Sequence, residues 1–166
     1  MYSNRISQAL HEEHRSTTAL MERLEKLIIH HRRGGPPDVN DRAVAQLLTE
    51  LSTSVEADVD RHFAFEENAV FAYLNENGDS AIGAHLTDEH GMMRPLGLRL
   101  AELARAAAGK GFDAAAWDEF RQLGQQYCDC MLAHVQKEEM ALLPLIQEMM
   151  DPDTEARLFQ DYVENV

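Results

Sequence analysis

The segment His62-Phe63-Ala64-Phe65-Glu66-Glu67 recurs in the second half of the chain as His134-Val135-Gln136-Lys137-Glu138-Glu139. Apolar residues at three- and four-residue spacing precede and follow both segments, which predicts that each segment lies within a long amphipathic helix. Positions i and i+4 share one face of a helix and lie about 6 Å apart along its axis, from a rise of ~1.5 Å per residue. Each segment therefore places an imidazole and a carboxylate together on an apolar helix face.

A second repeat lies upstream of each of these segments. Leu10-x-x-Glu13-His14 matches Leu86-x-x-Glu89-His90 position by position. The chain therefore resembles two copies of a helix pair. Each copy supplies a single histidine and then a His-x-x-x-Glu pair.

Three breaks rich in turn-forming residues, at 34–38, 75–79 and 109–111, divide the chain into four periodic segments. We expect helices over about 4–33, 41–75, 80–108 and 113–150, with Ser80 and Asp113 capping the last two. A short helix over 153–163 should follow Asp151-Pro152, where Asp caps and Pro takes the first helical position. Short connections make long helices antiparallel neighbours. We predict an all-α, up-down-up-down antiparallel four-helix bundle with a short C-terminal helix, forming one domain over 1–166.

Polar residues interrupt the apolar stripes at one height of this bundle. His14 lies about as far before the turn at Gly34 as His62 lies after Asn40, where that turn ends. Equal distances from a turn mean facing positions in antiparallel helices, and the same reasoning applies at the other two turns. Each polar group left unsatisfied in a core costs about 1–3 kcal/mol, so a layer of them requires an explanation. The groups in this layer are His14, His62, Glu66, His90, His134 and Glu138.

Metal coordination can satisfy all six groups together. Two carboxylates can each bridge two ions, and four imidazoles divide as two per ion. Imidazole with carboxylate suits iron, zinc or manganese. A buried polar network without metal is disfavoured, because so many histidines and carboxylates in register are rare in cores. We expect surface or supporting positions, and not ligation, for His11 and His85, and no ligation for Glu67 and Glu139, which lie about 100° further round their helices.

Composition excludes several classes of protein. The formal net charge of −14 disfavours nucleic acid and anionic membrane as partners and favours cations. The only cysteines, Cys128 and Cys130, cannot form a four-cysteine zinc site and do not indicate a disulfide framework. We find no apolar signal region and no run long enough to span a bilayer, so we expect a cytoplasmic protein.

The four motifs together resemble those of a known family. Leu10-His11-Glu12-Glu13-His14-Arg15, His62-x-x-x-Glu66-Glu67, Asp88-Glu89-His90 and His134-x-x-x-Glu138-Glu139 are similar to the signature segments of hemerythrin-like (HHE cation-binding) domains. The resemblance covers nearly the whole chain. It implies two non-haem iron ions, joined by an oxo or hydroxo bridge, that interact with O2 or NO.

The chain departs from the oxygen-carrying hemerythrins at two ligands. Those proteins have a fifth iron-binding histidine four residues before the position of His90, where this chain has Leu86, and a bridging Asp five residues after the last histidine, whereas Glu138 follows His134 by four. The pattern is closer to the four-His, two-Glu sites of the iron-cluster-repair and nitric-oxide-response relatives. The missing histidine argues against simple oxygen transport and for a nearly symmetric centre.

Three classes of function follow from the resemblance. The first is a di-iron protein that binds O2 or NO for sensing, storage or stress protection. The alternative is a di-iron enzyme for NO or peroxide detoxification or for iron-cluster repair, or a regulatory interaction domain that responds to its metal. We favour a binding protein, because turnover needs an electron donor and we see no flavin, haem or ferredoxin motif. The sequence does not identify such a donor or a regulatory partner protein.

Overall fold

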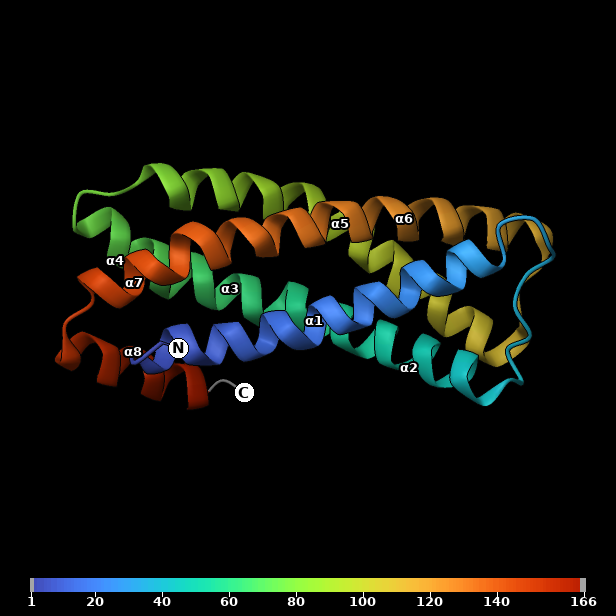
Figure 1. Ribbon diagram of the computed structural model, residues 1–166, viewed down its shortest axis with the longest axis horizontal. Coiled ribbons are helices and arrows are strands. Elements are labelled where there is room, and N and C mark those ends of the chain that lie inside the picture. Colours follow the sequence, from blue (N-terminus) through green and yellow to red (C-terminus); the bar gives the residue numbers. More distant parts are fainter. Residues whose placement is uncertain (1, 165–166) are drawn as a thin grey trace.

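Four long helical rods run alternately up and down the molecule in the computed structural model, which describes residues 2–164 (Figure 1). The first rod is α1 (Arg5–His30) and the third is α5 (Ala81–Lys110). The second rod joins α2 (Arg42–Ala57), η1 (Asp58–His62), α3 (Phe63–Phe65), η2 (Glu66–Val70) and α4 (Phe71–Glu76). The fourth joins α6 (Ala114–Lys137), η3 (Glu138–Leu142) and α7 (Leu143–Met149), and α8 (Pro152–Glu164) follows as a short C-terminal helix. The predicted fold class is confirmed.

Side-chain caps begin three of the four rods. The side chain of Asn4 accepts hydrogen bonds from the N–H groups of Ile6 and Ser7, and Asp41 and Asp113 cap the second and fourth rods in the same way. The prediction of a Ser80 cap was wrong. The Ser80 backbone has φ −95° and ψ −13°, which is helical and not the extended conformation that side-chain capping requires, so α5 begins without a cap hydrogen bond.

Three single-turn π-helical segments interrupt the second and fourth rods, where we expected regular α-helix. These segments are η1, η2 and η3, and they begin or end at candidate ligands: His62 ends η1, Glu66 begins η2 and Glu138 begins η3. A π turn closes its hydrogen bonds over five residues instead of four and is often found at functional sites. Two of the segments, η2 and η3, hold matching places in the internal repeat.

The third rod, α5, combines a proline with a very close helix approach. The helix continues through Pro95, and its ribbon bends between its two halves (Figure 1). A Cβ atom added at Gly97 would lie 2.9 Å from both the Tyr127 ring and the Val55 side chain. Glycine at this position therefore allows α5 to pack directly against α2 and α6.

The core consists of two separate apolar clusters with the polar layer between them. One cluster centres on Leu24, Leu48 and Phe120, and the other on Leu10, Leu74 and Ile146. The short helix α8 lies outside the four rods, alongside the first half of α1 (Figure 1). None of the described helices is long and apolar enough to cross a membrane.

Candidate metal centre

All six predicted residues converge in the layer between the two apolar clusters. The four rods supply them: α1 carries His14, the second rod carries His62 and Glu66, α5 carries His90, and the fourth rod carries His134 and Glu138. They form two groups whose ligand atoms lie within 4.8 Å of one another. Both groups contain Glu66 and Glu138; the first adds His14 and His62, and the second adds His90 and His134.

The two shared carboxylates face both groups, each through separate oxygen atoms. Glu66 Oε1 lies 3.3 Å from His62 Nε2, and Glu66 Oε2 lies 3.4 Å from His90 Nε2. Glu138 Oε2 lies 2.9 Å from His14 Nε2, and Glu138 Oε1 lies 3.0 Å from His134 Nε2. Each carboxylate is therefore placed to bridge two cations, each of which would also meet two imidazoles.

The inward-facing atoms of this layer are buried and lack hydrogen bonds. The side chains of Glu66 and Glu138 are fully buried, and neither oxygen of either carboxylate has a hydrogen-bond partner in the described structure. His14 Nε2 is unpartnered as well, because its contact with Glu138 is short but not aligned as a hydrogen bond. Buried carboxylates without partners are strongly disfavoured. A donor set of imidazole nitrogens and carboxylate oxygens around such atoms fits bound metal cations.

Four glutamates hold the outer nitrogens of the four imidazoles. Each glutamate is a sequence neighbour of one of the six candidate ligands. The Nδ1 contacts are His14 with Glu139 Oε1 at 2.7 Å, His62 with Glu13 Oε2 at 2.5 Å, His90 with Glu67 Oε1 at 2.9 Å, and His134 with Glu89 Oε2 at 2.8 Å. Carboxylates that hold ligand histidines in this way fix the ring orientation and raise the basicity of the ligand nitrogen.

These contacts determine which ring nitrogen carries the proton. A carboxylate can only accept, so each Nδ1 donates its N–H, and the Nε2 of a neutral ring is left as a lone pair that points inward. His90 Nε2 and His134 Nε2 lie only 3.0 Å apart. Two lone pairs at this distance repel each other unless a proton or a metal ion lies between them. Because the neutral rings present lone pairs, the centre is prepared for cations.

Without metal, protons compensate the charges of the layer. Burial, followed by the charge of Glu138, raises the pKa of Glu66 well above its usual value. Burial lowers the pKa of His90 to about 4. Burial also acts to lower the pKa of His14 and of His134, but the nearby Glu138 carboxylate outweighs it and leaves both raised. The same two imidazoles hold the pKa of Glu138 below its usual value despite burial.

The four supporting glutamates are the residues that sequence reasoning missed. Helical geometry correctly predicted that Glu67 and Glu139 do not face the shared centre, but it did not predict their contacts with imidazoles of neighbouring helices. The repeat carried the signal, since Glu13 matches Glu89 and Glu67 matches Glu139. His11 and His85 lie outside both groups, and each contacts one of these glutamates: His11 Nδ1 lies 2.9 Å from Glu139 Oε2 and His85 Nε2 lies 3.2 Å from Glu89 Oε1.

The surroundings of the two groups differ. The Phe63 ring stacks on His90 at a centroid distance of 3.9 Å, and His90 and His134 are almost completely buried. His62 retains 11% of its side-chain exposure and borders a cavity of about 490 Å³ between the second rod and α8. Asp58, one turn before His62, also lines this cavity. The first group is therefore closer to solvent than the second.

Comparison with known proteins agrees with this geometry. A family model described as the hemerythrin HHE cation-binding domain matches residues 5–146. The match covers all four rods up to α7 and includes the six convergent residues and the four glutamates that hold the imidazoles. A search of curated proteins found no match.

Proposed function

The chain belongs to the hemerythrin HHE cation-binding domain family, and from this premise we propose that it binds two iron ions and uses them to bind O2 or NO in sensing, storage or stress protection. In this proposal His14 and His62 would hold one ion, His90 and His134 would hold the other, and both ions would share Glu66 and Glu138. Iron would supply the affinity for diatomic ligands that the side chains lack.

The observation that carries the proposal is the sharing of two buried, unpartnered carboxylates between two pairs of imidazoles. A mononuclear site would leave one pair of imidazoles without a metal. Imidazole and carboxylate together match iron among the transition metals that proteins use, although zinc and manganese accept the same donors.

The position of Leu86 supports a diatomic ligand. It is completely buried in the apolar cluster beside the centre and cannot coordinate a metal. Each ion would therefore receive the same four protein groups, two imidazoles and two bridging carboxylates, and would keep room for a small external ligand. The protein would exclude bulk water, orient the imidazoles through Glu13, Glu67, Glu89 and Glu139, and direct their inward nitrogens toward the metal ions.

Metal analysis followed by optical spectroscopy tests this proposal. After anaerobic loading we expect about two irons per chain, and a value of one or none would reject the dinuclear centre. We then expect the reduced protein to give a new spectrum with NO, and to react with O2 to a stable oxidised state that degassing does not reverse. Full recovery of the reduced spectrum over repeated O2 cycles would instead indicate an oxygen carrier.

A further inference from the structure

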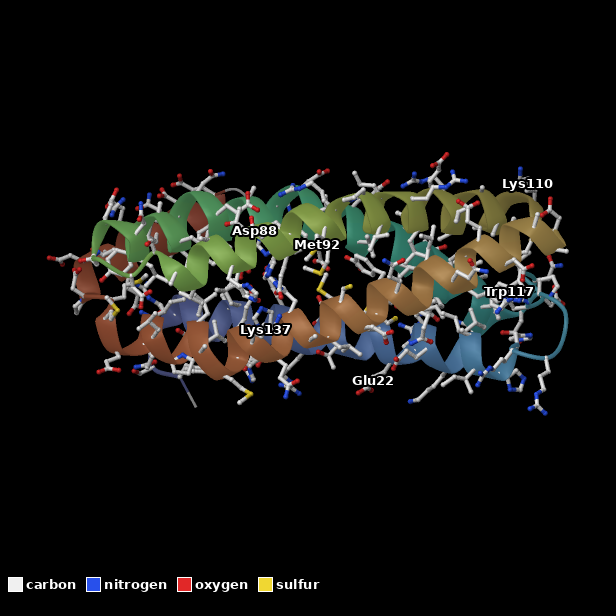
Figure 2. The ribbon with its side chains drawn as sticks, turned by 90° about the horizontal axis from the view of Figure 1, so that it is seen from above. Glu22, Asp88, Met92, Lys110, Trp117 and Lys137 are labelled. Atoms are coloured by element: carbon white, nitrogen blue, oxygen red, sulfur yellow. The ribbon has the colours of Figure 1, made fainter. Side chains whose placement is uncertain are left out.

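The four glutamates that hold the imidazoles have different outer partners in the two groups. In the group of His90 and His134, Glu67 pairs with the Arg94 guanidinium at 3.2 Å, and Glu89 pairs with the Lys137 ammonium. Figure 2 shows the bundle from the side of α5 and α6, and Lys137 lies at about the same level along the bundle as Asp88 and Met92. Both glutamates of this group therefore carry a fixed positive partner.

The group of His14 and His62 has partners of another kind. Glu139 contacts the His11 imidazole, and Glu13 accepts a hydrogen bond from the Tyr162 hydroxyl. Burial, followed by the hydrogen bond to Glu13, raises the pKa of Tyr162, so its hydroxyl remains a neutral donor at physiological pH. The contact thus fixes Glu13 without adding charge.

The internal repeat shows where this difference arises. Glu13 and Glu89 hold matching places, and Lys137 matches Phe65 when His134 is aligned with His62. The first copy therefore has a phenyl ring where the second has an ammonium group. The Tyr162 ring packs edge-on against the Phe65 ring at a centroid distance of 5.1 Å. The Tyr162 hydroxyl donates a hydrogen bond to Glu13, and so takes the place that the Lys137 ammonium takes beside Glu89. Tyr162 comes from α8, which lies beyond the residues matched by the family model.

We propose that Tyr162 is a positioning residue of the metal centre: α8 uses it to fix Glu13, and through Glu13 to fix His62, so that the two metal positions differ. A cation on a carboxylate withdraws electron density from it and weakens its hydrogen bond to an imidazole, whereas a phenol does so much less. His62 is therefore a more basic ligand than His134, and the ion at the His14 and His62 position favours the higher oxidation state. The inference rests on the proposed binding of two irons.

Mössbauer spectroscopy of the ⁵⁷Fe-loaded protein tests this difference, because it reports each iron separately. We expect two quadrupole doublets of equal area in the wild type. Tyr162→Phe should shift one doublet and Lys137→Met the other, and Lys137→Arg should keep the wild-type spectrum by retaining the cation. Tyr162→Phe should also speed the release of one iron to a chelator by about tenfold or more, the usual size of such supporting contacts.

A control variant and an alternative variant complete the test. Tyr73→Phe removes a hydroxyl that donates to the Met149 carbonyl at 2.8 Å, away from the six ligands, and should change neither doublet nor release rate. If Tyr162→Phe is poorly folded, Phe65→Lys places a cation beside Glu13 and should shift the same single doublet. Unchanged spectra, or equal shifts of both doublets in Tyr162→Phe, would overturn the inference. Wild-type protein that fails to bind two irons would instead reject the proposed function.

Discussion

At the scale of single residues, the centre depends on pairs of adjacent glutamates with different tasks. Glu66 and Glu138 point into the layer with unpartnered oxygens, whereas their neighbours Glu67 and Glu139 hold the outer nitrogens of His90 and His14. Two adjacent residues therefore have different roles: the first is a candidate bridging ligand, and the second orients an imidazole ligand.

Substitution of the two kinds of glutamate should give different losses of metal. Glu66→Ala or Glu138→Ala removes a bridge and should abolish binding of two irons. Glu67→Gln or Glu139→Gln keeps an acceptor for the imidazole N–H but removes its charge, so the iron held by that imidazole should bind with about 10–100-fold lower affinity. Chelator competition measures both effects, with the exposed Glu22→Gln as the control (Figure 2). Equal losses in the two pairs would contradict these roles.

The titration of the ligands predicts how pH affects the metal-free protein. His14 and His134 have raised pKa values in the folded state, so their contribution to stability is complete below the unfolded value of about 6.5 and is lost as pH rises through the folded values. The raised pKa of Glu66 acts in the same direction. We expect the denaturation midpoint of the metal-free protein to fall as pH rises above the unfolded histidine value.

Metal loading should reverse this dependence, because a metal replaces the protons that the layer holds. Binding should therefore release protons, which a pH indicator in weak buffer detects. A metal-free protein that becomes more stable over this pH range, or metal binding without proton release, would show that the layer is already deprotonated.

The six candidate ligands could be predicted because each occupies an apolar stripe at a position fixed by its distance from a turn. The repeat marks the glutamates beside them but does not reveal which imidazoles they contact, since contacts between neighbouring helices depend on how the rods are rotated about their axes. Sequence periodicity fixes which face of a helix is buried but leaves that rotation open by tens of degrees. The π turns at His62, Glu66 and Glu138 add a further local rotation that the α-helical pattern does not contain.

At the scale of elements, the close packing of α5 against α2 and α6 could not be predicted from the sequence either. A glycine in a helix generally costs about 0.5–1 kcal/mol relative to alanine, so Gly91 and Gly97 weaken α5 unless packing requires them. The structure separates the two cases. A Cβ at Gly91 would meet no atom within 4 Å, whereas one at Gly97 would meet Tyr127 and Val55.

Alanine substitution in α5 should therefore have opposite effects at these two positions. Gly97→Ala forces the Tyr127 ring or Val55 to move and should lower the free energy of unfolding by about 1–3 kcal/mol. Gly91→Ala should raise it by about 0.5–1 kcal/mol, because it removes backbone entropy without a clash. Thermal unfolding of the metal-free proteins measures both changes. A stabilising Gly97→Ala would mean that the rods are further apart than described.

At the scale of the whole molecule, metal binding to the folded state should stabilise it by mass action. At a free metal concentration of about 100 times Kd, the gain is about 2.7 kcal/mol. The net charge of −14 attracts cations of any kind, so a rise in Tm could also arise from the surface. Mg²⁺ at the same concentration is the control, since it prefers oxygen ligands and does not suit a site rich in imidazole. Equal Tm shifts with Mg²⁺ and iron would mean that the stabilisation comes from cations bound at the protein surface.

The division of the core into two apolar clusters has a consequence for how the protein opens. Without metal, the ends of the bundle are joined through a polar layer and not through continuous apolar packing. We therefore expect amide hydrogens at the two ends to exchange with solvent through separate opening events of different free energy. Two ions held by all four rods would tie the ends together, so that the whole bundle opens as one cooperative unit.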